Sequence, residues 1–218
     1  MAGPSRSLTS GGIFYSLARF SLPVLLTLFL QALYGGVDLL VVGQFASTAD
    51  VSGVSTGSML LSTFTMLVTG LSMGPTVTVG EAIGSGSPKE AGRAVLAGLT
   101  LLGSLAVLLT LGLALFAQPL AALLDAPPEA MDRTVAYIRI CGLGMVFIVA
   151  YNFLGAVLRG AGDAKTPLYT VAVACAVNIV GDLLLVAGFH LGAAGAALRH
   201  FVVFGGGDVY GGADFLAR

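Results

Sequence analysis

The chain consists of long apolar stretches separated by short polar breaks. Five stretches each hold about 20 or more predominantly apolar residues: Phe20–Val42, Val54–Val79, Ala94–Phe116, Val135–Leu158 and Leu168–Phe189. A helix of about 20 such residues is long enough to cross the hydrocarbon core of a bilayer, which is roughly 30 Å thick. The pattern therefore predicts five transmembrane helices and leaves no linker long enough for a soluble domain.

The pattern weakens after the fifth stretch. The sequence GAAGAAL at 192–198 begins like another helix, but Arg199, His200 and a Gly-rich polar sequence follow. The apolar residues around this Arg-His pair are too few to cross a membrane, and the glycines weaken a helix. We expect an all-α integral membrane bundle of five transmembrane helices plus an incomplete sixth. Residues 1–198 would form this transmembrane unit, and 199–218 a divergent tail from a frameshifted or truncated gene.

The composition fits a membrane protein. Charged residues make up 10% of the chain, against about 25% in soluble domains, and hydrophobic residues make up 56%. The formal net charge of −1 offers no basic surface, so we expect no nucleic-acid partner. The 31 glycines suit helices whose backbones approach closely. Two pairs at four-residue spacing in the second stretch predict such contacts: Gly53 with Gly57, and Gly70 with Gly74.

Lys and Arg residues are distributed unequally between the two sides of the predicted spans. One side carries six basic residues: Arg6, Arg19, Lys89, Arg93, Arg159 and Lys165. The other side carries only Arg133 and, at the start of the fourth span, Arg139. Because cytoplasmic loops are enriched in Lys and Arg, we expect the N-terminus to be cytoplasmic. Segments 83–93 and 159–167 then form cytoplasmic loops, and 125–133 faces outward.

Two carboxylates, Asp38 and Asp182, lie inside predicted spans. An Asp at the centre of a membrane helix costs about 2.5 to 3.5 kcal/mol on insertion scales, so such residues usually face the protein interior and mark ion or proton pathways. At 1.5 Å per residue they lie roughly 27 and 21 Å from the cytoplasmic ends of their spans, both in the outer half. At similar depth they can share a pocket and together take up and release a proton, or hold a cation between them. The alternative is an Asp that reaches water near a span end or hydrogen-bonds a neighbouring helix.

Other polar residues accompany these carboxylates. Asn178 precedes Asp182 by one helical turn, so its amide and the carboxylate lie on one face and can meet the same Na⁺ or relay a proton. The alternative for Asn178 is a hydrogen bond that holds two helices together. Tyr137 and Asn152 lie in the fourth span, where a structural role is the simpler interpretation of each. Pro23 is either a simple proline near a helix start or the site of a bend in the first span.

Other short patterns do not support an enzyme or a cofactor site. GAGD at 160–163 matches the GxGD pattern of presenilin-like intramembrane aspartyl proteases, but it lies in a predicted loop, whereas that chemistry needs the Asp within a span. The glycines of 83–93 lack the preceding strand and the Gly-Lys-Ser/Thr ending of a P-loop. His190 and His200 have no metal-ligand spacing to a cysteine. We therefore expect no enzymatic activity.

Several segments, in this order and separation, resemble the multidrug and toxic compound extrusion (MATE) transporters. PVLLTLFLQALYGGVDLLVVGQF resembles the first helix of that family, with its proline and aspartate. GLSMGPTVTVGEAIGSG resembles the second helix and the loop after it. LRGAGDAKTPLY and VNIVGDLLLVAGFHLGAAGAAL resemble the region of the fourth and fifth helices. The resemblance covers about residues 15 to 198 and implies the N-terminal lobe of an exporter built from two six-helix lobes.

The resemblance implies roles for individual residues. The first-helix carboxylate of the family falls on Asp38, and its cation-binding Asn and Asp fall on Asn178 and Asp182, which would hold Na⁺ in a sodium-coupled member. A polar contribution from the fourth helix would come from Tyr137 or Asn152. Pro23 would bend the first helix as protonation changes.

The function that the resemblance implies is antiport. Amphipathic or cationic drugs would leave the cell in exchange for H⁺ or Na⁺, with no cofactor besides the coupling ion. The chain holds half the family's helices, so transport would need a homodimer or a C-terminal lobe. The resemblance and the short loops predict the bacterial inner membrane as the location, with the bilayer as surroundings.

Two other functions stay open. A lipid-linked sugar flippase of the same superfamily also has paired bundles, but it is expected to line its cavity with more basic residues than these spans hold. A non-transporting membrane fragment or interaction partner would need no second lobe.

Overall fold

The computed structural model describes residues 13–189, 193 and 195–197, and the described part is helical and contains no strand. The all-α prediction is therefore confirmed. The elements in chain order are α1 (Ile13–Phe45), α2 (Thr48–Gly84), α3 (Pro88–Leu115), α4 (Ala117–Leu123), the 3₁₀ turn η1 (Pro128–Ala130), α5 (Met131–Leu143), α6 (Met145–Gly160), α7 (Lys165–Asp182) and the π-helical segment η2 (Leu183–Gly188).

The predicted spans correspond to these helices. Within the described residues, four helical stretches are long and apolar enough to cross a membrane, and α5 and α6 together make a fifth. The four stretches are Phe14–Phe45, Thr48–Gly84, Pro88–Leu115 and Lys165–Val186. Residues 193 and 195–197 are helical, which is consistent with the start of a sixth helix. The predicted tail, 199–218, lies outside the described residues.

The fourth span is broken, whereas the sequence pattern predicted one continuous helix over Val135–Leu158. The axes of Pro128–Leu143 and Met145–Gly160 differ by 49°. At the break, the Gly144 N–H donates to the carbonyls of Ile140 at 3.3 Å and Cys141 at 3.0 Å, so the regular hydrogen-bond ladder is interrupted. A Cβ at Gly142 would lie 2.5 Å from Cβ of Leu113 on α3. Two glycines thus permit both the bend and the close approach of α3.

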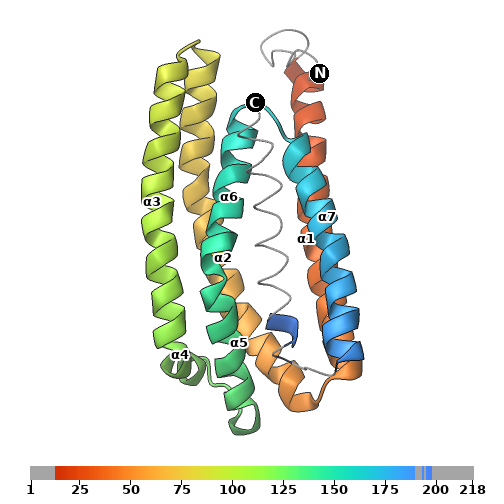
Figure 1. Cartoon of the computed structure of the whole chain (residues 1–218). Coiled ribbons are helices and arrows are strands. Elements are labelled where there is room, and N and C mark those ends of the chain that lie inside the picture. The colour runs from red at the N-terminus through yellow and green to blue at the C-terminus, as the bar shows by residue number, and fades with distance from the viewer. Residues whose placement is uncertain (1–12, 190–192, 194, 198–218) are drawn as a thin grey trace.

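The helices form two groups. Helices α2, α3, α5 and α6 pack on one another, and α1 packs mainly on α7 and η2. In the described part of the chain, the two groups touch each other much less than the helices within each group do. Figure 1 shows α1 and α7 side by side, running in the same direction and apart from the other group. We call the first group the four-helix body and the second the α1–α7 pair.

The connections alternate between the two ends of the bundle. The described start of α1, the α2–α3 turn and the α6–α7 turn lie at one end, which we call the N-terminal end (Figure 1). The α1–α2 turn, α4 and η1 lie at the opposite end, which we call the α4 end (Figure 1). This alternation agrees with the predicted assignment of the loops to the two sides of the membrane, on which the comparison of Lys and Arg residues depends.

Glycines bring the helices of the four-helix body close together. A Cβ at Gly53 would lie 2.7 Å from Cβ of Arg133, and one at Gly57 would overlap the ring of Tyr137. The predicted role of Gly53 and Gly57 in helix contact is confirmed. The same prediction for Gly70 and Gly74 is wrong in the described part of the chain, because nothing lies within 4 Å of a Cβ at either position. Their face of α2 is exposed, so spacing alone did not identify the contact.

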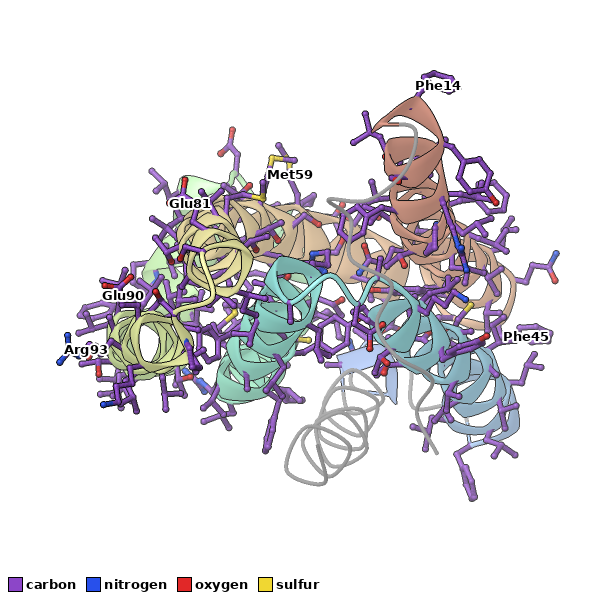
Figure 2. All side chains as sticks on the ribbon, turned by 90° about the horizontal axis from the view of Figure 1, so that it is seen from above. Phe14, Phe45, Met59, Glu81, Glu90 and Arg93 are labelled. Atoms are coloured by element: carbon purple, nitrogen blue, oxygen red, sulfur yellow. The ribbon has the colours of Figure 1, made fainter. Side chains whose placement is uncertain are left out.

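The outer surface of the bundle is apolar. Seen from above, Phe14 and Phe45 point outward from α1, and Met59 points outward from α2 (Figure 2). Their exposed fractions are 85%, 47% and 69%. Such a surface, on helices of membrane-spanning length, is the surface expected to face lipid chains.

Candidate functional site

One face of α1 is buried and carries a row of polar side chains. Thr27 and Asp38 are 8% and 7% exposed, whereas Leu40, on another face, is 65% exposed. Gln31 and Tyr34 are partly buried and lie between Thr27 and Asp38 at helical spacing. Sequence reasoning missed Gln31 and Tyr34, although the same helical spacing in the sequence could have identified them as part of the row.

The buried face of α7 carries Asn178 and Asp182. These side chains are 1% and 0% exposed, and Val171 and Cys175 continue the same buried row toward the start of the helix. The one-turn spacing therefore places the amide and the carboxylate on one face. A charge that is completely removed from solvent inside a membrane helix is costly, which favours a functional role over a passive one.

The backbone changes directly after Asp182. Helix α7 ends at Asp182 and continues as the π-helical segment η2, in which the Phe189 N–H donates to the Leu184 carbonyl at 2.9 Å. Segments of π-helix are rare and often occur at functional sites, because they shift the register of the following side chains. Nothing in the hydrophobic pattern of Leu183–Gly188 predicted this change.

The two carboxylates lie on neighbouring helices in the same half of the bundle. Because α1 and α7 run in the same direction and pack together, Asp38, near the end of α1, and Asp182, at the end of α7, both lie toward the α4 end (Figure 1). No group of three or more His, Cys, Asp or Glu side chains among the described residues could hold a metal ion. The set is instead two carboxylates, each of which can accept a proton, and one amide, and the oxygen atoms of all three groups can bind a hard monovalent cation.

Pro23 lies inside α1 rather than at its start. The helix begins at Ile13, so Pro23 is past the first turns and its missing N–H removes a hydrogen bond from the helix interior. The interpretation of Pro23 as a simple N-terminal proline is therefore wrong. The Thr27 hydroxyl donates to the Pro23 carbonyl at 2.8 Å, a contact that often accompanies helix bending. Bending of α1 at Pro23 stays a prediction.

Tyr137 and Asn152 lie on the four-helix body. Tyr137 on α5 is 1% exposed, with its ring against Gly57 of α2. The Asn152 amide donates to the Ile148 carbonyl at 2.8 Å, and its oxygen accepts from the Thr69 hydroxyl at 3.0 Å. The Tyr137 ring thus packs α5 against α2, and Asn152 bonds α6 to α2 and to its own preceding turn. The structural interpretation of Asn152 is thus the one that its contacts support.

Sequence reasoning missed one buried carboxylate, Asp50, in the first turn of α2. It is 7% exposed and interacts with Ser47, Arg133 and the backbone of Ala193. The signal was present, because Ser47 and Asp50 have the spacing of a helix N-cap with an acidic residue three positions later.

Sequence comparison identifies relatives of this chain. The MatE family profile matches residues 23–184. A protein of Bacillus subtilis named "Probable multidrug resistance protein YpnP" is 28% identical over 203 residues, which are 93% of this chain and 46% of that protein. The "Multidrug export protein MepA" of Staphylococcus aureus is 26% identical over 194 residues, 85% of this chain and 41% of that protein.

Structural comparison agrees in fold. A crystal structure of MATE in the straight conformation superposes with a TM-score of 0.88 at 22% sequence identity, covering 97% of this chain and 47% of that one. The chain thus spans less than half the length of the relatives it matches. Since the family profile covers most of the chain and the helices are apolar and of spanning length, this integral membrane protein belongs to the MatE family.

Proposed function

We propose that the chain is the N-terminal lobe of an exporter that moves amphipathic or cationic drugs out of the cell by antiport with H⁺ or Na⁺. The observation that carries this proposal is the burial of Asp38, Asn178 and Asp182 on two adjacent, parallel membrane helices. The names of the bacterial relatives, multidrug resistance and multidrug export proteins, support the substrate class.

The chemistry follows from the cost of burying charge. Two ionised carboxylates in one half of a membrane bundle repel each other and are poorly solvated, so binding of a proton or Na⁺ to them is favourable. Asn178, one turn before Asp182, adds an amide oxygen to the same face. Uptake of an ion removes net negative charge from the α1–α7 pair, and ion release restores it. A cationic drug gains from the restored charge, so ion and drug exclude each other.

The missing half of the transporter and its orientation in the membrane are proposed from the length of the chain and the distribution of its Lys and Arg residues. Because the chain spans less than half of its relatives, a homodimer or a separate C-terminal lobe would supply the second half of the transport path. The excess of Lys and Arg at the N-terminal end supports the proposal that this end faces the cytoplasm and that the membrane is a bacterial inner membrane. The proposal contains no covalent step and needs no cofactor.

The decisive experiment is ethidium efflux from bacteria that lack their own pumps. The strains would express this chain, Asp38→Asn, Asp182→Asn or an empty vector, each with and without the C-terminal half of a relative. Asp132→Asn is the matched control, because it removes the same charge from an exposed position. We expect efflux that Asp38→Asn and Asp182→Asn abolish and Asp132→Asn leaves intact. Efflux that survives both site substitutions, or no efflux in any combination despite confirmed membrane expression, would contradict the proposal.

A second measurement identifies the coupling ion as H⁺ or Na⁺. Purified protein in liposomes is given a drug gradient, and internal pH is followed with a dye in buffers with and without Na⁺. Drug-driven proton movement that persists without Na⁺ identifies H⁺ as the coupling ion. Drug movement that requires Na⁺ at constant pH identifies Na⁺, and movement independent of both ions would contradict antiport.

A further inference from the structure

Asp50 forms a junction between three parts of the chain at the α4 end. The Ser47 hydroxyl donates to Oδ2 of Asp50 at 2.6 Å, and the Asp50 N–H donates to the Ser47 hydroxyl at 3.2 Å. Oδ1 of Asp50 lies 3.4 Å from Nε of Arg133 on α5 and accepts the N–H of Ala193 at 3.2 Å. One buried carboxylate therefore contacts the α1–α2 turn, the four-helix body and the helical residues that follow η2.

The contact with α5 is reinforced by close packing. The Asp50 side chain is 10% exposed while Arg133 is 57% exposed, so the ion pair joins a buried anion to a partly solvated cation. A Cβ at Gly53, one turn after Asp50, would lie 2.7 Å from Cβ of Arg133 and 3.1 Å from the Thr134 nitrogen. The start of α2 is consequently fixed against the start of α5, and Asp50 is held with it.

Both carboxylate-bearing helices run toward this junction. The chain passes from Asp38 through the end of α1 to Asp50 in twelve residues, and from Asp182 through η2 to Ala193 in eleven. Elsewhere, the described residues of the α1–α7 pair have few contacts with the four-helix body. Asp50 thus joins the ends of both helices to each other and to the body.

We propose that Asp50 is a positioning residue that anchors the α4 ends of α1 and of the segment after α7 to α5. The α1–α7 pair then moves as one unit about this anchor, and its N-terminal end has the larger displacement. This inference rests on the proposed ion-coupled transport for the movement, but not for the anchor. Ion binding at Asp38 and Asp182 then changes the tilt of the pair and does not separate its two helices.

The anchor is tested by distances between spin labels on the full chain in nanodiscs, with Cys141 and Cys175 replaced by Ala. The α4-end pair is Phe45→Cys with Leu115→Cys, and the N-terminal-end pair is Leu17→Cys with Leu96→Cys. All four label sites are exposed. In Asp50→Asn we expect the distance distribution at the α4 end to broaden, because the charge that holds Arg133 is lost. Asp132→Asn, which removes an exposed charge next to Arg133, should leave it unchanged.

The variants also cover the case in which Asp50→Asn does not fold. Ser47→Ala and Arg133→Gln each remove one partner of Asp50, and each should broaden the same distribution to a smaller extent. An α4-end distribution identical to that of the unsubstituted protein in every folded variant overturns the anchor.

The N-terminal-end pair separates the anchor from the proposed function. In the unsubstituted protein, protonation or Na⁺ should shift the distance at the N-terminal end and leave that at the α4 end unchanged. In Asp50→Asn both distances should shift. If the α4-end distribution broadens in Asp50→Asn but no ion shifts either distance in the unsubstituted protein, the anchor stands and ion coupling fails. If the ion shifts the two distances of the unsubstituted protein by the same amount, the proposed movement of the pair about the anchor is overturned.

Discussion

The four-helix body and the α1–α7 pair differ in the glycines at their helix contacts and in the carboxylates that they bury. In the body, five glycines lie at helix contacts: Gly53, Gly57, Gly98, Gly142 and Gly160 each face a neighbouring helix so closely that a Cβ would overlap it. In the pair, Gly35, Gly36 and Gly43 of α1 have nothing within 4 Å of an added Cβ among the described residues. The pair instead carries the buried carboxylates Asp38 and Asp182, whereas Asp50 of the body is buried in the first turn of α2.

The difference teaches where rigidity and chemistry are located. Membrane helices gain stability chiefly from close van der Waals packing, which the glycines of the body permit. Buried carboxylates contribute cost rather than cohesion unless they bind something. The body thus supplies a stable frame, and the less tightly attached pair carries the carboxylates that we propose to bind ions.

The largest expected effect on stability comes from adding a methyl group where two helices of the body touch. A Cβ at Gly160 would lie 2.6 Å from the Thr76 carbonyl oxygen of α2, and backbone cannot rotate away as a side chain can. We expect Gly160→Ala to lower the free energy of unfolding by about 3 kcal/mol, as overpacking does. Thermal unfolding in detergent measures the change.

Gly74→Ala is the matched control for Gly160→Ala. Gly74 lies within α2 with nothing near an added Cβ in the described structure, so this substitution should be neutral or slightly stabilising. Equal loss of stability in both variants would show that glycine is required for helix flexibility rather than for the α2–α6 contact.

The next effect has the opposite sign and lies in the α1–α7 pair. Asp38→Asn and Asp182→Asn remove buried charge without changing side-chain volume. We expect each to leave the free energy of unfolding unchanged or to raise it by about 1 kcal/mol, although each abolishes efflux. Thermal unfolding beside the efflux assay measures both properties. A loss of stability comparable to that of Gly160→Ala would mean that the carboxylates are structural.

A smaller effect tests the polar contact within the body. The Thr69 hydroxyl donates to Asn152 at 3.0 Å between α2 and α6. A double-mutant cycle with Thr69→Val and Asn152→Leu should give a coupling energy of about 0.6 kcal/mol, typical of such bonds in membranes. Thr100→Val replaces Thr69→Val in the control cycle, because its hydroxyl bonds to Leu96 of its own helix. A cycle in which Asn152→Leu also abolished efflux would return Asn152 to the candidate site.

The sequence predicted the elements whose cause is local. The length of the apolar stretches alone located the spans, because every residue of a membrane helix lies in the same apolar surroundings. The cost of buried charge singled out Asp38 and Asp182 for the same reason. The structure places both on buried faces of adjacent helices, as their depth predicted in part.

What the sequence did not predict depends on contacts between distant segments. The break at Gly144 lies two residues from the close approach of α3 to Gly142, and hydropathy carries no information about such a partner. Gly53 and Gly70 begin equivalent spacings in α2, yet only the first faces another described helix. Asp50 lies near a span end, where a carboxylate is ordinarily solvated, so its burial by Arg133 and Ala193 had no signal in hydropathy.

The smallest effect concerns the freedom of α1 around Pro23. The Thr27 hydroxyl shares the Pro23 carbonyl with the helix ladder and so weakens the backbone bond next to the proline. Thr27→Val keeps the shape but removes the hydroxyl, and we expect amide exchange in the turn after Pro23 to slow by an amount equal to about 0.3 kcal/mol. Thr63→Val removes the same contact, to Met59, in a helix segment without a nearby proline, and should change exchange less. Equal slowing in both would show that the contact acts on any helix, and faster exchange in Thr27→Val would show that the hydroxyl supports α1 rather than loosens it.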